Sequence, residues 1–313
     1  MVDKDYQILR VAELYYKQGY SQQSIASIMG TSRPTVSRLI NEAREKGIVK
    51  IHIDTPVNMN YELSTKIKEK FKLKDALVVN VNDENEELAI SQVGTVAARL
   101  IMSLMENDMI IGISFGKHVK YMIEAIQENE MKNIKVVQLV GALGNGDPNT
   151  DGPELVINLA NRLHGEYRYI NSPAVVNDVR LKDSLLAQPQ IKHTLHLINQ
   201  CNIAIHGIGS LDEGNSSMKR SGYINEELRK KYINDGAVGH VLGHLIGSDG
   251  SVIEETNHHV VGASLELLKN TDWSIGIATN AIKYKAVLSA MIGKHVNCII
   301  INYSLAKKLL EDS

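Results

Sequence analysis

The hydrophobic positions of the first thirty residues predict two helices. Apolar side chains recur at helical spacing over residues 8–16, and Gly19 then provides a stop. Ser21 is suited to cap a second, short helix, because its hydroxyl can accept a hydrogen bond from the first turn. Gly30 is suited to end that helix, since glycine readily takes the left-handed conformation of a tight reversal. The chain is therefore expected to begin with two short helices joined by a turn.

A third helix is predicted to begin after Ser32, a suitable cap, and to end at Gly47. Pro34 lies in its first turn, where a missing backbone N–H costs nothing. Apolar side chains recur on one face of this helix, and hydroxyl, amide and guanidinium side chains lie on the other. The next residues, 48–53, alternate apolar with basic side chains and predict a wing strand. This order of elements is typical of a winged helix-turn-helix.

The third helix has the side chains that reading a DNA major groove requires. Arg33 and Arg38 can donate pairs of hydrogen bonds to guanine edges or to phosphate oxygens. The small hydroxyl residues let the backbone approach phosphates. Residues 1–53 carry three more basic than acidic side chains, although the whole chain has a formal charge of −2. A three-helix dimerisation module with a solvated basic face is the alternative. The candidate DNA contacts are Ser21, Gln22, Ser32, Arg33, Thr35, Ser37, Arg38, Asn41, Arg44 and Lys50.

The remainder of the chain alternates helical and strand-like patterns, which predicts a parallel sheet with helices on both faces. The polar segment 54–60 is predicted to be a linker between a DNA-binding domain, 1–53, and a larger second domain, 61–313. Strands are expected at 76–81, 109–113, 134–140, 202–206, 274–278 and 297–301, and helices at 61–71 and 88–105. The predicted fold class is α/β, with a Rossmann-like parallel sheet after the winged helix-turn-helix.

Glycine-rich turns follow three of the predicted strands. Because ligands of open α/β sheets bind beyond the carboxyl ends of the strands, we expect these turns to surround one pocket. Glycine at a strand end is more often simple turn chemistry, and neither a P-loop nor a full GxGxxG pattern is present, so a nucleotide is not favoured. The candidate effector contacts are Gly112, Ser114, Gly116, Lys117, Gly141, Ala142, Gly144, Asn145, Gly207, Gly209, His240, Asp249 and Lys283.

The composition fits a folded protein of two domains, with 313 residues, 43% hydrophobic and 22% charged. The longest apolar runs are far shorter than the roughly 20 residues that cross a membrane, and the first residues do not resemble a targeting segment. Cys201 and Cys298 lie in or beside apolar runs and are expected to be buried thiols. We therefore expect a cytoplasmic protein without a membrane span, a cofactor or a metal.

Segment 21–51 resembles the DNA-binding region of the SorC family of sugar-responsive bacterial transcription regulators, and the likeness covers nearly the whole chain. It continues at 112–116, 138–142, 207–209, 237–240 with Asp249 and Gly250, and 280–283. The resemblance implies an effector domain similar to sugar-phosphate isomerases, which binds a sugar or sugar phosphate and thereby controls a carbohydrate-utilisation operon. It also implies homo-oligomers, dimers or tetramers, on palindromic or repeated operator DNA. The chain departs from the family pattern at Ala142, His240, His244 and Asn280.

A zinc site has to be weighed, because four histidines lie close together in the sequence: His240, His244, His258 and His259. The HEXXH pattern is absent, so sugar-hydroxyl contacts or plain loop positions are favoured. Asp249, with the glycine that follows it, is a hairpin signal first and a site candidate second. Lys283 is placed to bind an anion at a helix start, and a solvated lysine is the alternative.

The competing function is a sugar-phosphate isomerase or lyase with an appended DNA-binding domain. Such chemistry needs a general base beside the substrate carbon and usually a second acid. Glu154, Asp178 and Asp249 are candidates, but no spacing selects a pair. A purely architectural DNA protein is disfavoured, because the second domain is larger than DNA binding alone demands. The sequence therefore favours a regulator over an enzyme.

Overall fold

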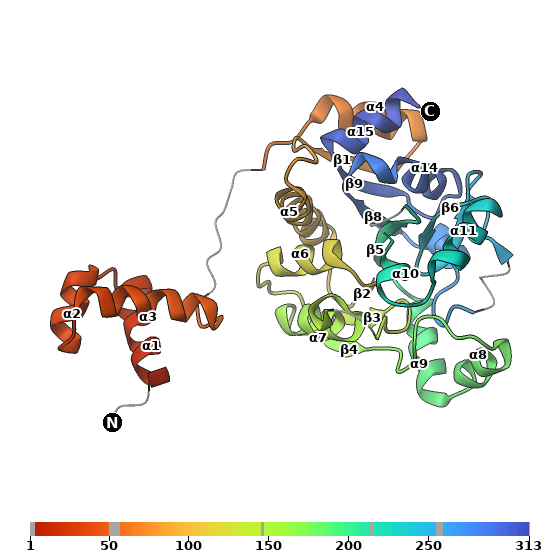
Figure 1. Cartoon of the computed structure of the whole chain (residues 1–313). Coiled ribbons are helices and arrows are strands. Elements are labelled where there is room, and N and C mark those ends of the chain that lie inside the picture. The colour runs from red at the N-terminus through yellow and green to blue at the C-terminus, as the bar shows by residue number, and fades with distance from the viewer. Residues whose placement is uncertain (1–3, 50–56, 145–146, 213–215, 255–258, 313) are drawn as a thin grey trace. The chain divides into compact units, whose positions relative to one another are not determined.

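The computed structural model describes residues 4–49, 57–144, 147–212, 216–254 and 259–312. Contacts between residues divide the chain into two compact units, Met1–Pro56 and Val57–Ser313. We call them the small unit and the large unit and describe each by itself (Figure 1).

The small unit packs three helices around one apolar core. α1 (Lys4–Ala12) continues into a π-helical turn, Glu13–Lys17, and is followed by α2 (Gln22–Met29) and α3 (Arg33–Glu45), so the three predicted helices are confirmed. The core is formed by Ile8, Val11, Leu14, Ile25, Val36, Leu39 and Ile40, with smaller alanines between them.

The predicted helix ends of the small unit are also confirmed. The Ser21 hydroxyl accepts a hydrogen bond from the backbone N–H three residues later (3.1 Å), and the Ser32 hydroxyl does the same (3.4 Å). Gly30 ends α2 with a positive φ of 61°. The described part of the predicted wing, residues 48 and 49, forms no strand, and residues 50–53 lie outside the described residues.

The large unit is built on a sheet whose main path has the order β1-β9-β8-β5-β2-β3-β4, with every neighbouring pair parallel. The strands are β1 (Asp75–Val79), β2 (Ile110–Ile113), β3 (Lys135–Gln138), β4 (Glu166–Arg168), β5 (Ile203–Ser210), β6 (Ala237–Val241), β7 (His244–Gly247), β8 (Trp273–Ala278) and β9 (Cys298–Asn302). β6 pairs antiparallel with the end of β5, and β7 pairs with β6. The predicted α/β class with a parallel sheet is confirmed.

Helices cover both faces of this sheet, because successive strand residues point into two separate apolar clusters (Figure 1). In β9, Ile299 and Ile301 join the cluster of α9, α14 and α15, whereas Cys298 and Ile300 join that of α5, α6 and α7. The helices are α4 (Tyr61–Phe71), α5 (Glu86–Leu104), α6 (Lys117–Ala125), α7 (Gly152–Arg162), α8 (Val179–Leu186), α9 (Pro189–Ile198), α10 (Ser217–Arg220), α11 (Glu226–Asn234), α13 (Leu265–Asn270), α14 (Tyr284–Ile292) and α15 (Tyr303–Glu311), with short 3₁₀ segments η2 (Pro148–Thr150) and η3 (Ala281–Lys283).

Two expectations from composition can be checked in the large unit. Cys201 and Cys298 are free and buried, as predicted. α5 is long and apolar enough to cross a membrane by length and composition alone, but it contacts β1, β8 and β9 and buries one face among them. A buried core helix explains its composition.

Candidate functional site

A cavity of about 760 Å³ opens where the chain reverses its direction across the sheet. From β2 the chain moves outward to β3 and β4, and it then returns to the other side of β2 to form β5. The loops beyond the carboxyl ends of β2 and β5 therefore diverge and leave a crevice, as in other open α/β sheets. Eight of the predicted effector contacts line it: Ser114, Gly116, Lys117, Gly144, Gly207, Gly209, His240 and Lys283.

Four predicted contacts lie outside this lining. A Cβ atom at Gly112 would meet Leu139, and one at Gly141 would meet the carbonyl oxygens of residues 172 and 173, so both glycines serve close packing. The Ala142 carbonyl accepts the Tyr223 hydroxyl at 2.7 Å. The Asp249 carboxylate holds the turn between β7 and the bridge at Val252 by accepting hydrogen bonds from the residue two positions on, which confirms the predicted turn. Asn145 lies outside the described residues.

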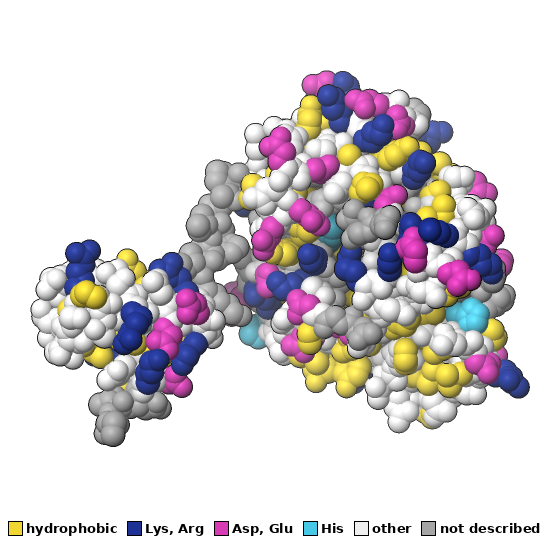
Figure 2. Space-filling model, viewed as in Figure 1, with side chains coloured by type: hydrophobic (Ala, Val, Ile, Leu, Met, Phe, Trp, Pro, Cys, Tyr) yellow, Lys and Arg dark blue, Asp and Glu magenta, His cyan; other side chains and the backbone are white. Residues whose placement is uncertain are grey.

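Three cationic side chains line the cavity: Lys117 at the start of α6, Arg220 at the end of α10 and Lys283 at the end of η3. Burial lowers the pKa of Lys283 to about 8; nearby Glu86 opposes the shift, and Arg220 adds to it. Figure 2 shows several Lys and Arg side chains near the middle of this face of the large unit. The cavity can therefore hold an anion through charge as well as through hydrogen bonds.

η3 carries Lys283 into the cavity because an acidic side chain fixes its first turn. The Asp83 carboxylate accepts hydrogen bonds from the Ala281 backbone N–H (2.9 Å) and from the Asn302 side-chain amide (2.7 Å). Asn280 precedes η3 with a positive φ of 80°, and its side chain caps the segment. Lys283 is thus held beyond the carboxyl end of β8, and Asp83 and Asn302, the last residue of β9, fix the segment that carries it.

Two histidines beside these cations are held in the neutral form. The His118 Nε2 lies 2.9 Å from the Thr279 hydroxyl, and burial, followed by the charge of Lys283, holds the pKa of His118 well below its usual range. His240 is buried, and burial lowers its pKa to about 4. A neutral imidazole can exchange hydrogen bonds with a ligand hydroxyl without adding charge.

The loop after β3 forms one wall of the cavity and is fixed by Asp151. This carboxylate accepts hydrogen bonds from the backbone N–H groups of Leu143 (2.8 Å) and Gly144 (3.0 Å), and it also caps α7. The backbone N–H of Gly116 donates to the Thr150 carbonyl at 2.9 Å, which ties this wall to the turn after β2. Asp151 was not among the site residues predicted from the sequence, although an acidic residue before Gly-Pro-Glu is a recognisable helix start.

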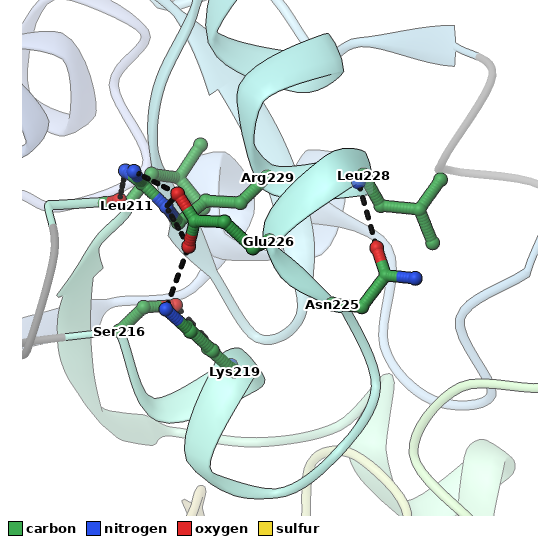
Figure 3. A network of polar contacts seen from close by, with 7 residues as sticks. All are labelled: Leu211, Ser216, Lys219, Asn225, Glu226, Leu228 and Arg229. Atoms are coloured by element: carbon green, nitrogen blue, oxygen red, sulfur yellow. Dashed lines mark hydrogen bonds and ion pairs between the residues drawn. The ribbon is translucent and has the colours of Figure 1, made fainter.

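Arg220 was also missed, because nothing near it in the sequence indicates a ligand. α10, which carries it, is held to α11 by a network around Glu226 (Figure 3). Lys219 and Arg229 contact the Glu226 carboxylate at 2.6 and 2.7 Å, and Arg229 also donates to the Leu211 carbonyl at 2.8 Å. Hydrogen bonds from Arg229 and then Lys219 lower the pKa of Glu226 to about 2. The network therefore remains ionised at neutral pH.

The histidines also bear on the zinc alternative. The His244 Nε2 lies 2.9 Å from the Ala263 carbonyl, and the His259 Nδ1 lies 2.8 Å from the Val176 carbonyl. Within the described residues, which leave out His258, His, Cys, Asp and Glu form no group of three that could hold a metal ion. These contacts give both rings structural partners in the backbone.

The small unit presents most of the predicted DNA contacts at its surface. Arg33, Arg38, Asn41 and Arg44 are exposed, whereas Gln22, Thr35 and Ser37 are partly buried. The hydroxyls of Ser21 and Ser32 accept the capping hydrogen bonds of α2 and α3, which places both at helix N-termini. Arg44 donates to the Asn41 side chain at 2.9 Å. Lys50 lies outside the described residues.

Comparison with known proteins defines the class. The sequence profile of the family described as "Putative sugar-binding domain" matches residues 55–311, and the profile of the Crp-like helix-turn-helix domain matches residues 10–56. A helix-turn-helix joined to a sugar-binding domain defines a DNA-binding transcription regulator.

The chain belongs to this sugar-binding-domain family, and its predicted SorC-type relationship is confirmed. It is 29% identical to the Sorbitol operon regulator of Klebsiella pneumoniae, with 97% of each chain covered. It is also 29% identical to the Deoxyribonucleoside regulator of Bacillus subtilis (strain 168), over 99% of this chain and 100% of that protein. The crystal structure of the full-length Sorbitol Operon Regulator SorC from Klebsiella pneumoniae covers 98% of this chain and 100% of its own, with a TM-score of 0.75 and 27% identity.

Proposed function

We propose that this regulator controls a carbohydrate-utilisation operon through a phosphorylated sugar that binds in the cavity of the large unit. The observation that carries the proposal is the combination of Lys117, Arg220 and Lys283 around one cavity at the strand ends. Three cations are suited to a phosphate group, and the neutral rings of His118 and His240 are suited to sugar hydroxyls. The relatives named for sorbitol and deoxyribonucleosides support a carbohydrate ligand.

Control requires a coupling free energy between the two sites, so that a bound ligand changes the affinity of the protein for DNA. The cavity wall is made of loops and strand ends, such as the loop fixed by Asp151, that a bound ligand would hold in one arrangement. The proposed ligand therefore favours one packing between copies of the chain and so changes the spacing of paired α3 helices. The proposal includes that the protein acts in the cytoplasm, where operator DNA lies, and that it acts as a homo-oligomer.

We also propose that the chain is not an enzyme. Four carboxylates line the cavity: Glu86, Asp147, Asp151 and Glu154. Asp151 already accepts hydrogen bonds from three backbone N–H groups, and Asp147 accepts two from Asn149. This arrangement disfavours an acid–base pair of the kind that an isomerase needs. Turnover of ribose 5-phosphate or a related sugar phosphate by the purified protein would contradict this part of the proposal.

The test is a thermal-shift screen of the full chain with inorganic phosphate, free sugars and their phosphates, followed by DNA binding with the ligand that is found. A ligand at one hundred times its Kd raises the free energy of unfolding by about 2.7 kcal/mol, which gives a clear increase in Tm. Lys283→Gln is expected to lose affinity by about tenfold or more, since charge-assisted hydrogen bonds contribute about 1.5–3 kcal/mol. Lys285→Gln is the matched control, because Lys285 is exposed and outside the cavity lining. A screen in which neither a sugar nor a phosphate shifts the Tm would refute the proposal.

A further inference from the structure

A groove of about 690 Å³ lies on the large unit and is separate from the cavity, because the two have no lining residue in common. It is formed where the ends of β5, β7 and α11 meet the start of β6, the segment η3, the start of α14 and one residue of α15. α14 contacts β6, η3 and α15, which brings these segments together (Figure 1). We call it the η3 groove. Its volume falls in the range of sites that bind small molecules.

The wall of the η3 groove is largely apolar. Ile233, near the end of α11, is 41% exposed, and Ile282 of η3 is 42% exposed. Leu211 and Ala237 also line the groove and are buried, so an apolar surface continues from the two isoleucines into the core. Because covering exposed isoleucine side chains removes apolar surface from water, the groove is suited to an apolar ligand body.

Two lysines give the same groove a positive end. The Nζ atoms of Lys285 and Lys308 lie 5.9 and 5.2 Å from the ring centroid of Tyr284, so the three side chains are neighbours. Lys308 is paired with Asp312 at 2.7 Å, whereas Lys285 forms no ion pair with any residue that the structure describes. Asp212 is the acidic residue of the lining, and its carboxylate is already hydrogen-bonded to a nearby hydroxyl. The ammonium of Lys285 is therefore available to an anionic group of a ligand.

The segment η3 links the groove to the cavity. Ala281 and Ile282 line the groove, and Lys283, the next residue, lines the cavity. The Asp83 carboxylate accepts a hydrogen bond from the Ala281 backbone N–H at 2.9 Å, which anchors the segment at its start. A ligand packed on Ile282 would restrain the rest of the segment, including the backbone of Lys283. Occupancy of the groove is therefore expected to be coupled to the position of a cation in the cavity.

We propose that the η3 groove is a second ligand site of this regulator, for a small organic anion with an apolar body, and that its occupancy raises the affinity of the cavity for phosphate. The apolar body covers Ile233 and Ile282, and the anionic group lies against Lys285. Ligands in the groove and in the cavity favour the same fixed arrangement of η3, so the coupling is positive and reciprocal. The coupling rests on the proposed function, because it needs a phosphate site at Lys283, whereas ligand binding in the groove does not.

The test uses the full chain and the probe 8-anilinonaphthalene-1-sulfonate, an aromatic sulfonate whose fluorescence rises in an apolar site. Lys285→Glu is expected to weaken probe binding by about tenfold or more, because it reverses the charge that faces the sulfonate. Ile233→Ser is expected to weaken it by about threefold or more, because apolar contact is lost.

Matched controls make the same changes outside the lining of the groove. Lys307→Glu alters an exposed lysine beside Lys308, and Ile292→Ser alters an isoleucine that is 50% exposed at the end of α14. Both controls are expected to bind the probe within twofold of the parent. Equal probe affinities of Lys285→Glu and Lys307→Glu would overturn the second site. So would a probe affinity that fell as the protein concentration rose, because a second copy of the chain would then cover the groove.

Inorganic phosphate, added at constant ionic strength, tests the coupling. Saturating phosphate is expected to raise the probe affinity of the parent by about fivefold or more. Lys283→Gln is expected to bind the probe as the parent does without phosphate and to lose this increase. A parent probe affinity that phosphate left unchanged or lowered would overturn the coupling. Failure of the proposed function gives a different result, in which neither phosphate nor a sugar shifts the Tm but Lys285→Glu still weakens probe binding.

Discussion

Gly209 is the residue on which the floor of the cavity depends most directly. It lies opposite His240 in the pairing of β5 with β6, and a Cβ atom at position 209 would lie 1.9 Å from the His240 Nε2. We predict that Gly209→Ala lowers the free energy of unfolding by about 1–3 kcal/mol, because the His240 ring is buried and must be displaced. It should also abolish the ligand-induced thermal shift.

Denaturant unfolding of Gly209→Ala and Gly207→Ala would check this prediction. Gly207 is the matched control, because it lies in the same strand and also lines the cavity, but the nearest atom to its added Cβ would be 4.0 Å away. Equal stability of the two variants would show that the contact between position 209 and His240 does not constrain the fold.

Lys283 gives the site a predicted pH dependence. Its pKa is lowered to about 8 in the folded protein, and only the ammonium form attracts a phosphate dianion. Affinity for a sugar phosphate is therefore expected to fall as the pH rises from 7.5 to 9.5. The fall is up to about tenfold for each pH unit above the pKa that Lys283 has in the ligand-free protein. Calorimetric titration at several pH values would measure it. The Lys283→Gln variant should bind weakly and with little dependence on pH over this range, and a parent affinity that stayed constant would contradict the role given to Lys283.

The sequence predicted some of the site residues because local chemistry identifies them. Gly116 follows β2, and Lys117 accompanies that turn. Gly207 and Gly209 were predicted to form a turn after a strand that ends at residue 206, and this was wrong, because β5 continues to Ser210 through its pairing with β6 and β8. Arg220 could not be predicted, because α10 is placed by contacts with segments later in the chain: the ion pair of Lys219 with Glu226 and the packing of Met218 with Ala237 and Leu245. Gly112 and Gly141 were indistinguishable from ligand glycines, since the side chains and carbonyls they accommodate come from distant segments.

At the scale of elements, the α10–α11 pair shows how a distant carboxylate can position a ligand contact (Figure 3). We predict that Glu226→Gln weakens binding of the sugar phosphate several-fold, because Lys219 and Arg229 lose their common anionic partner and Arg220 is no longer held beside the cavity. Neighbouring Glu227 is exposed, so Glu227→Gln serves as the control. A loss confined to Glu226→Gln, with Tm changed little in the absence of ligand, would identify a positioning residue. Unchanged affinity for the sugar phosphate in both variants would refute the positioning role of Glu226.

The elements themselves were predictable where apolar periodicity was strong. α4 occupies the predicted residues 61–71, and α5 matches the predicted helix to within two residues at each end. β4 was missed, because all three of its residues are exposed at the edge of the sheet and so carry no hydrophobic pattern. β6 and β7 were missed as a pair, since their order in the sheet depends on the antiparallel contact with the end of β5.

At the scale of the whole molecule, the two units are expected to carry separable activities. Arg38 is exposed on α3 and has no place in the cavity of the large unit. We predict that Arg38→Ala weakens specific DNA binding by about 1–3 kcal/mol, because it removes a guanidinium that can contact guanine edges or phosphates. The thermal shift with a sugar phosphate should not change.

Fluorescence anisotropy over a series of salt concentrations can distinguish the two contacts that Arg38 could make. Loss of a phosphate contact lowers the dependence of log K on log salt by about one unit and affects all sequences alike, whereas loss of a base contact relaxes selectivity at one position. Arg180→Ala is the control, because Arg180 is an exposed arginine of the large unit, on α8. DNA binding by Arg38→Ala that matched the parent at every salt concentration would show that Arg38 does not contact DNA. The DNA contacts of α3 would then have to be sought among its other exposed side chains, beginning with Arg33 and Asn41.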